Sequence, residues 1–334
     1  MQSVERVCAQ DRDSVAVRVE VAARLARVIP HDAYCFATVD PRTLLLTGEV
    51  SQGIPHGSAS VAVHNEYLVE DVDKFADLAR SRHPVGILGL STGGEPGRSH
   101  RFRTVLPLIE AGDEMRVVFL ADGRCWGALS LFRGRARPGF TPRDGEIARS
   151  VTRTVAKALR RAAVRRDLSA VTGSAGPGVL VLDARDEVVV ANDAAERWAG
   201  ELSAQRLALH EVAGAARAGR GADACIRVRS RDGQWLSVRG STVDGAGPGG
   251  VSVVIQPATS SDVTSMLVLG HALTAREREV LQHVIAGTPA PAIATELRVS
   301  VHTVESHLKS LCAKAGVSGR KRLVSQFIGQ LHGL

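Results

Sequence analysis

The strongest constraint on the fold is a succession of three helix patterns, each with its own start and stop, between Thr274 and Gly316. Thr274 and Glu277 form a capping box that begins the first helix, and Gly287 is placed to end it. Thr288 can cap the second helix, which is short. Pro289 and Pro291 fall in the first turn of this second helix, where backbone donors have no helical partner. Ser300 can cap the third helix, and Gly316 can end it. The pattern predicts an all-α domain of short, closely connected helices.

The third helix, from Val301 to Ala315, separates into two faces when its residues are projected at about 100° each. Its apolar side carries Val301, Val304, Leu308, Leu311 and Ala315. Its polar side carries His302, Glu305, Ser306, Lys309 and Ala313. We expect the apolar side to pack on the first two helices and the polar side to form a narrow outward ridge, which fits the major groove of DNA.

Glu305 is an unusual residue for such a ridge. A carboxylate near phosphates is unfavourable for binding that ignores sequence, but it can accept a hydrogen bond from cytosine N4, so it favours a helix that reads bases. The alternative is a solvated side chain that pairs with Lys309 one turn later, a contact worth about 0.3 kcal/mol. Both interpretations remain open, and the two contacts can form in different states.

Three consecutive cations, Arg320, Lys321 and Arg322, begin the last helix of the chain. Cations at a helix N-terminus oppose the helix dipole by about 0.3–1 kcal/mol each, so they do not serve local stability. Contact with phosphates explains them, and the alternative is a solvated run of charge. The whole chain has 42 Lys and Arg against 35 Asp and Glu, a formal charge of +7, which suits a polyanionic partner without separating nucleic acid from a membrane surface.

The stretch LTAREREVLQHVIAGTPAPAIATELRVSVHTVESHLKSLCAKAGVSGRKRLV resembles the LuxR-type helix-turn-helix of bacterial transcription regulators. The resemblance rests on LTxREREVL, on IAxxL in the second helix, on S-x-x-TV-x-x-H in the third and on K-x-GVS-x-R after it. It implies that Glu305, Ser306 and Lys309 face bases and that Thr303, His307, Lys314 and Arg320 lie near phosphates.

With the ridge analysis, the expected base-facing set is His302, Glu305, Ser306 and Lys309. The expected phosphate set is Thr303, His307, Lys314, Arg320, Lys321 and Arg322. Two departures from the family pattern matter: Glu305 stands where a basic or polar residue is usual, and AlaProAla replaces a polar entry of the Asn-Lys-Glu type. No operator sequence can therefore be carried over from the family.

Strand and helix patterns precede this domain. YCFATVD and LLLTGEVS predict paired strands, a helix is expected from Tyr67 to Arg80, and RTVLPLIEAG, EMRVVFLADG and WGALSLFRG are strand-like. Asp122 and Gly123 predict a hairpin between the last two of these. Helices are expected at 15–28 and, after a cap at Thr141, at 142–168. The apolar face of the second of these needs a partner, either the sheet or a second copy of itself.

A second group of strands lies between the breaks at 174–178 and 257–264. GVLVLD and VVVAND lead into a helix, and CIRVRS and WLSVRGSTV, joined by Asp232 and Gly233, are followed by GVSVVIQP. We expect a small mixed sheet of about five strands with little helix. Nine of the twelve aromatic residues precede position 141 and can build either a core or a small-molecule cavity, of which the core is favoured.

Residues 15–168 resemble a GAF domain and residues 174–258 a short PAS domain, mainly by the order of their elements. The expected class is an α+β multidomain chain: a flexible arm at 1–14, the GAF-like and PAS-like domains, a linker at 259–270 and a four-helix LuxR-type domain at 271–334. No ligand-binding residue can be carried over from either resemblance. An unidentified small molecule in the GAF-like domain is a candidate ligand.

Catalytic and cofactor patterns are weak. GLSTG at 89–93 matches a G-x-S-x-G nucleophile motif around Ser91, but GEPGRS cannot supply the helix that must follow, so a loop is favoured. Asp183 imitates a receiver aspartate, yet no Lys lies between Lys157 and Lys309. The histidines lack metal-ligand spacing, and the five cysteines are odd in number and far apart. We expect no enzyme activity, no metal and no cofactor.

The function hypothesis is a transcription regulator that binds double-stranded DNA as a homodimer under the control of its N-terminal domains, with RNA polymerase as a further candidate partner. The 142–168 helix is the candidate dimer contact. No apolar run reaches the roughly 20 residues of a membrane span and the first residues are too charged for a signal peptide, so we expect no membrane partner and a cytoplasmic location. The alternative is a sensor or scaffold that acts through protein partners, with a vestigial helix-turn-helix.

Overall fold

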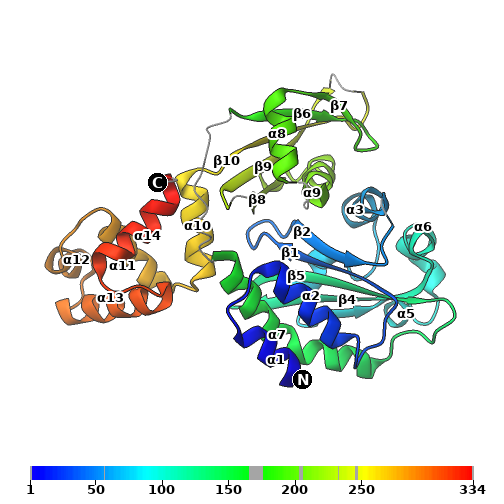
Figure 1. The fold of residues 1–334 in the computed structure, drawn as a ribbon, viewed down its shortest axis with the longest axis horizontal. Helices are drawn as coiled ribbons and strands as arrows, with labels where there is room; N and C mark the ends of the chain where they lie inside the picture. Colours follow the sequence, from blue (N-terminus) through cyan, green and yellow to red (C-terminus); the bar gives the residue numbers. More distant parts are fainter. Residues whose placement is uncertain are drawn as a thin grey trace. The chain divides into compact units, whose positions relative to one another are not determined.

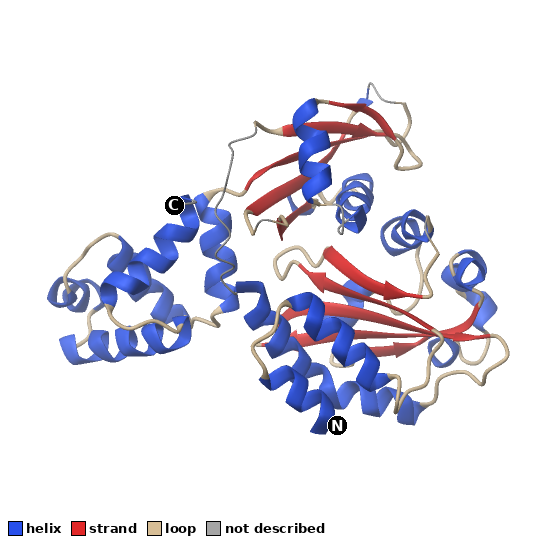
Figure 2. Ribbon diagram, in the orientation of Figure 1, coloured by secondary structure: helices blue, strands red, loops and turns tan. Residues whose placement is uncertain are grey.

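The computed structural model describes residues 2–55, 57–164, 176–202, 206–231, 233–244 and 247–332. The chain forms two compact units: an N-terminal unit that contains residues 2–164 and 176–257, and a C-terminal unit that contains residues 258–332. The two N-terminal domains expected from the sequence therefore lie in one unit. Figure 2 shows strands in the N-terminal unit and helices throughout the described part of the C-terminal unit.

The first sheet has the strand order β2-β1-β5-β4-β3, with every pairing antiparallel. Its strands are β1 (Ala33–Val39), β2 (Leu46–Gln52), β3 (Val85–Ile87), β4 (Ala111–Ala121) and β5 (Arg124–Gly134). One face is covered by α2 (Ser14–Leu25) and α7 (Pro142–Val164), on which α1 (Gln2–Ala9) packs; the other carries α3 (Ser58–Leu68) and α4 (Phe75–Arg80) (Figure 1). The expected β1–β2 pair and the β4–β5 hairpin are confirmed, and Asp122 and Gly123 both have the positive φ that such a tight turn requires.

Several expectations for this half were wrong. The flexible arm is instead α1, because Val4, Val7 and Cys8 are buried against α7 and α2. The helix expected from Tyr67 to Arg80 is two helices, separated by a stretch in which Asp73 has a φ of 54°. The strand expected in RTVLPLIEAG is a short helix, α6 (His100–Thr104), and a 3-10 turn (Leu106–Ile109).

Helix α7 begins as its sequence predicts. Thr141 Oγ1 accepts from the backbone N–H of Asp144 at 3.2 Å, and the Thr141 N–H donates to the Asp144 carboxylate at 2.8 Å. Its apolar residues, among them Val151, Val155 and Leu159, are buried against the sheet and against α1 and α2. This covered face cannot be the dimer contact that we expected of it. Residues 165–168 of the expected helix lie outside the described residues.

The second sheet has the order β7-β6-β10-β9-β8. Its strands are β6 (Gly178–Leu182), β7 (Val188–Ala191), β8 (Cys225–Arg229), β9 (Trp235–Thr242) and β10 (Val251–Pro257). Every pairing is antiparallel, where a mixed sheet was expected. Counted within each sheet, the strand order is the same as in the first. Of the expected β8–β9 turn, Gly233 has a φ of 87°, and Asp232 lies outside the described residues.

Two helices pack on one face of this second sheet: α8 (Asp193–Glu201), capped by Asn192, and α9 (Arg206–Arg217). The sequence pattern predicted little helix here, and α9 was not expected. Besides the sheet, α9 packs on α3 and β2 of the first half. The core of the second sheet and the contacts of α9 together make the N-terminal unit continuous.

The C-terminal unit has five helices in its described residues. They are α10 (Ser260–Gly270), α11 (Ala275–Ile285), α12 (Ala290–Leu297), α13 (Val301–Ala315) and α14 (Arg320–His332). The linker expected at 259–270 is therefore a helix: Thr259 caps α10, and Val263, Met266 and Leu267 are buried. No helix in the described part of the chain combines the length and the apolar character needed to cross a bilayer.

Candidate nucleic-acid interface

Helix α13 has the start and end that its sequence predicts. The Ser300 hydroxyl accepts from the backbone N–H of Thr303 at 3.1 Å, and Gly316 ends the helix with a φ of 67°. The preceding turn places Arg298 in the left-handed region, with a φ of 53°. One detail upstream differs from the prediction, because Pro289, rather than Thr288, occupies the N-cap position of α12.

The inner face of α13 is buried in the core of the C-terminal unit. Val304, Leu311 and Ala315 are buried, as are the residues of α11 and α12 that they face: Val280, Leu281, Val284, Ile293 and Ala294. Val301, expected on this side, is 41% exposed. A helical projection assigns a residue to a side, but it does not say how far along the helix the neighbouring helices cover that side.

The outer face of α13 is the polar ridge expected from the sequence. His302, Glu305, Ser306 and Lys309 are all exposed, and Thr303 and His307 are half-buried at its margin. No ion pair or hydrogen bond joins Glu305 to Lys309 in the described part of the chain, so the one-turn pair offered as an alternative does not form in this structure. The four ridge side chains are therefore free to meet a ligand.

A buried carboxylate fixes α13 to α11. Glu277, which is 4% exposed, closes the expected capping box with Thr274. It also accepts from the Ser310 hydroxyl at 2.7 Å and from Lys314 Nζ at 2.6 Å, both on α13. Burial raises the pKa of Glu277, but the bonds from Lys314, Ser310 and Thr274 outweigh burial and lower that pKa to about 2. Helix α13 is thus fixed to α11 by an ion pair between the buried Glu277 and Lys314.

This ion pair was not predicted, and it changes the interpretation of Lys314. Lys314 was expected near phosphates, yet its ammonium group binds Glu277 and the carbonyl of Ala272 at 3.2 Å. The sequence carried a usable signal, since Ser310 and Lys314 are one turn apart on α13 and so point in the same direction.

The start of α14 presents the expected cations in different ways. Lys321 and Arg322 are exposed, and Arg322 donates to the Ser318 hydroxyl at 3.2 Å. Arg320 is half-buried, and its guanidinium donates to the carbonyl of Thr288 in the α11–α12 turn. Arg320 therefore also ties α14 to the turn ahead of α12.

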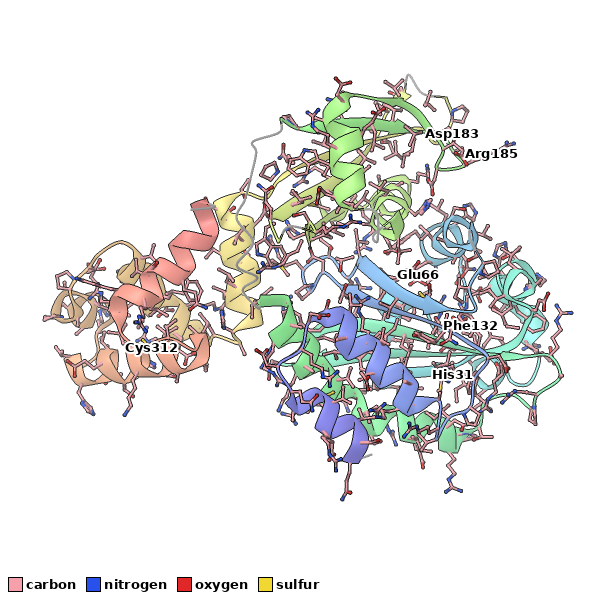
Figure 3. The ribbon with its side chains drawn as sticks, in the orientation of Figure 1. His31, Glu66, Phe132, Asp183, Arg185 and Cys312 are labelled. Carbon is pink, nitrogen blue, oxygen red and sulfur yellow. The ribbon has the colours of Figure 1, made fainter. Side chains whose placement is uncertain are left out.

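Two other positions considered from the sequence lie in a short helix and in a strand turn. Ser91 is exposed at the last position of a single helical turn, α5 (Leu88–Ser91), whereas a nucleophile elbow places its serine between a strand and a following helix. The expected loop at GLSTG is thus partly helical. Asp183 accepts backbone N–H bonds from Arg185 and Glu187 at 2.8 and 2.9 Å and closes the β6–β7 turn (Figure 3).

Comparison with known proteins agrees with this geometry. Residues 271–327 match the family described as bacterial regulatory proteins, luxR family. The spore germination protein GerE of Bacillus subtilis is 38% identical over 56 residues, which are 17% of this chain and 76% of GerE. The chain belongs to the LuxR family. Its matched segment covers α11, α12 and α13 completely.

This LuxR-family chain matches its curated relatives over only 17% of its length. NarL of Mycobacterium tuberculosis, a probable transcriptional regulatory protein, is 47% identical over 58 residues, which are 17% of this chain and 27% of NarL. Among solved structures, Escherichia coli SdiA aligns over 99% of this chain and 95% of its own with 13% identity and a TM-score of 0.38. A TM-score this low supports no conclusion about the N-terminal unit.

Proposed function

We propose that this LuxR-family chain is a transcription regulator that binds double-stranded DNA in a sequence-specific manner through α13. The observation that carries the proposal is the division of α13 into a buried apolar side and an exposed ridge of four polar side chains. A helix held in this way can enter the major groove without losing its contacts to the domain. A regulator of this kind works on chromosomal DNA, so we place it in the cytoplasm, and we assign it no catalytic role.

Within this proposal, His302, Glu305, Ser306 and Lys309 contact bases. Thr303, His307, Arg320, Lys321 and Arg322 lie near phosphates. We assign Lys314 to positioning α13, since its ammonium group is held by Glu277. Glu305 favours sites with cytosine, because its carboxylate can accept from cytosine N4 and is unpaired with Lys309 in the structure.

Fluorescence anisotropy with labelled fragments of the source genome tests the proposal. Lys309→Ala should weaken binding to the preferred fragment by about 1–3 kcal/mol and relax its sequence preference. Lys321→Ala should weaken binding to all fragments alike and reduce the salt slope by about 1. Arg153→Ala, which removes an exposed cation from α7, is the matched control and should change neither property. Binding that is insensitive to salt and to both test variants would rule the proposal out.

We further propose that the chain binds DNA as a homodimer, because paired half-sites multiply the affinity of a single domain. The α7 face is excluded as the contact by its burial. Sedimentation of the full chain with and without a two-half-site fragment measures this directly. RNA polymerase remains a candidate partner of the bound regulator.

We propose that the N-terminal unit, with its GAF-like and PAS-like halves, senses a small molecule. A cavity of about 990 Å³ in this unit supports the proposal, because small-molecule sites in proteins are of this size. The cavity lies next to β1, β2, β4 and β5 and to α3 of the first half, and next to α8 and α9 of the second.

A further inference from the structure

The cavity floor contains a row of polar side chains where a sheet face under a helix is usually apolar. Ser51, Cys35, Ser130 and Arg116 are aligned partners on β2, β1, β5 and β4, and all four line the cavity. Burying polar groups costs free energy unless they find partners. The hydrogen-bond and ion-pair partners of these four side chains therefore decide what the cavity floor can bind.

Arg116 is fully engaged by the protein. Its guanidinium binds Glu66 at 2.7 Å and Glu114 at 2.9 Å, and Glu114 also accepts from Arg101 and, at 2.7 Å, from the Ser130 hydroxyl. The cation of the cavity floor is thus neutralised by two carboxylates. It is not available to hold an anionic ligand.

Glu49 is the opposite case. This half-buried carboxylate accepts from the Cys35 thiol at 3.0 Å and forms no ion pair with any described residue. The guanidinium of Arg18 interacts electrostatically with Glu49, but the hydrogen bonds of Arg18 go to the carbonyls of Ser14, Phe36 and Gly48. Burial and the neighbouring Glu49 raise the pKa of Cys35, so the thiol stays protonated and continues to donate.

The wider lining has the same bias. Among the described lining residues there are seven carboxyl groups and two guanidinium groups, in a chain whose formal charge is +7; burial raises the pKa of one of the seven, Glu211, to about 8, which leaves six carboxylates near neutral pH. Ile54, Val105, Ile109 and Phe132 are apolar members of the same lining, and Figure 3 labels Phe132 on β5 and Glu66 on α3. The site therefore combines an acidic end with an apolar body.

We propose that this cavity binds a small organic amine, whose ammonium group pairs with Glu49 while its apolar part lies against Phe132, Ile54 and Ile109. An ammonium group has three donors, so the hydroxyl of Ser51, two residues along β2 from Glu49, can accept from it as well. This inference rests on the proposed function only in assigning the amine as the signal. A carboxylate or phosphate ligand at this end of the cavity is disfavoured, because it would face Glu49, and the Arg116 guanidinium is already bound by Glu66 and Glu114.

Isothermal titration of the full chain tests this with three amines, 2-phenylethylamine, benzylamine and 3-phenylpropylamine, and with an acid of similar size, 3-phenylpropionate. We expect at least one amine to bind and the acid to bind at least about tenfold more weakly, the effect of a charge-assisted hydrogen bond. Glu49→Gln, which keeps the shape of the side chain, should weaken the amine by about the same factor. Glu95→Gln is the control, since Glu95 is exposed and pairs with Arg98.

The proposal is overturned if the acid binds as well as the amines, if no amine binds at millimolar concentration, or if Glu49→Gln leaves amine affinity unchanged. The comparison of amine with acid uses the native chain, so it holds even if the variant folds poorly. DNA is absent from the titration. Failure here would leave DNA binding intact, and failure of DNA binding would leave the amine site intact.

Discussion

Glu277 accepts from donors at the start of α11 and on α13, and these contacts fix the position of α13 against α11. The Thr274 N–H, Ser310 hydroxyl and Lys314 ammonium all donate to it at 2.6–2.7 Å. Removing the charge while keeping the shape, as in Glu277→Gln, should lower the opening free energy of α11 and α13 by about 1–3 kcal/mol, because hydrogen bonds to a buried charge are strong. Hydrogen exchange of the α13 amides measures this quantity.

The matched control is Glu279→Gln on the same helix. Glu279 is 45% exposed and pairs with Arg276, so its loss should change the opening free energy by less than about 0.5 kcal/mol. The pH dependence has a definite sign. The pKa of Glu277 is lowered to about 2, so its contribution is present above about pH 4.5 and is lost as pH falls toward 2. Equal exchange in both variants would show that Glu277 does not stabilise the contact between α11 and α13.

Helix α9 joins the two halves of the N-terminal unit through a close approach at Gly214. A Cβ atom there would lie 2.6 Å from Val63 Cγ1 and 2.8 Å from Tyr67 Cδ2, both on α3. Gly200 in α8 has open space at the same position. Both glycines gain the same helix propensity on replacement by Ala, so the difference between the two variants isolates the clash.

We therefore expect Gly214→Ala to be less stable than Gly200→Ala by about 1–3 kcal/mol, the usual cost of overpacking. Urea unfolding followed by tryptophan fluorescence reports on this unit alone, because all three tryptophans, Trp126, Trp198 and Trp235, lie in it. Indistinguishable midpoints would mean that α3 and α9 are not packed as described.

The elements that sequence predicted well are those with local signals. The capping box at Thr274, the cap at Ser300 and the turn at Asp122 each specify a boundary within a few residues, and the ridge of α13 followed from periodicity alone. Helices α1 and α9 were missed for a different reason. Short helices are marginal alone, and these two are stabilised by partners far away in sequence, α7 for one and α3 for the other.

The candidate site was predictable to the same extent. The exposure of His302, Glu305 and Lys309 followed from the pattern, because a helix face is a local property. The capture of Lys314 by Glu277 joins residues 37 positions apart, and the charge balance of the cavity depends on four strands in register. Such contacts depend on tertiary packing, which no local pattern describes.

At the scale of the whole N-terminal unit, buried polar contacts join the two sheets. Arg227 in the middle of β8 pairs with Asp40 after β1 at 3.3 Å, and Arg220 donates to the carbonyl of Thr43. Glu211 on α9, only 1% exposed, accepts from the Leu46 N–H at 2.9 Å and from the Tyr67 hydroxyl. Separating the halves would break these contacts together with the packing of α9 on α3 and β2, so the unit should unfold as one.

Glu211 makes that cooperativity depend on pH. Burial raises its pKa to about 8, and nearby Glu66 adds to the effect, while the bonds from Tyr67 and Leu46 and the charge of Arg220 oppose it. With the folded pKa above the unfolded value, the neutral form favours folding. Stability from this group is full below about pH 4.5 and is lost as pH rises to about 8.

Glu211→Gln imitates the neutral carboxyl at every pH. It should match the native chain within about 1 kcal/mol at acidic pH and exceed it by on the order of 1–3 kcal/mol above pH 8, where the native chain must bury a charge. Urea unfolding of both proteins from pH 5 to 9, followed by tryptophan fluorescence, gives the two curves. Parallel curves would show that Glu211 does not titrate where the two halves meet. Tyr67→Phe removes one donor to Glu211, so this variant should be less stable than the native chain across the whole pH range.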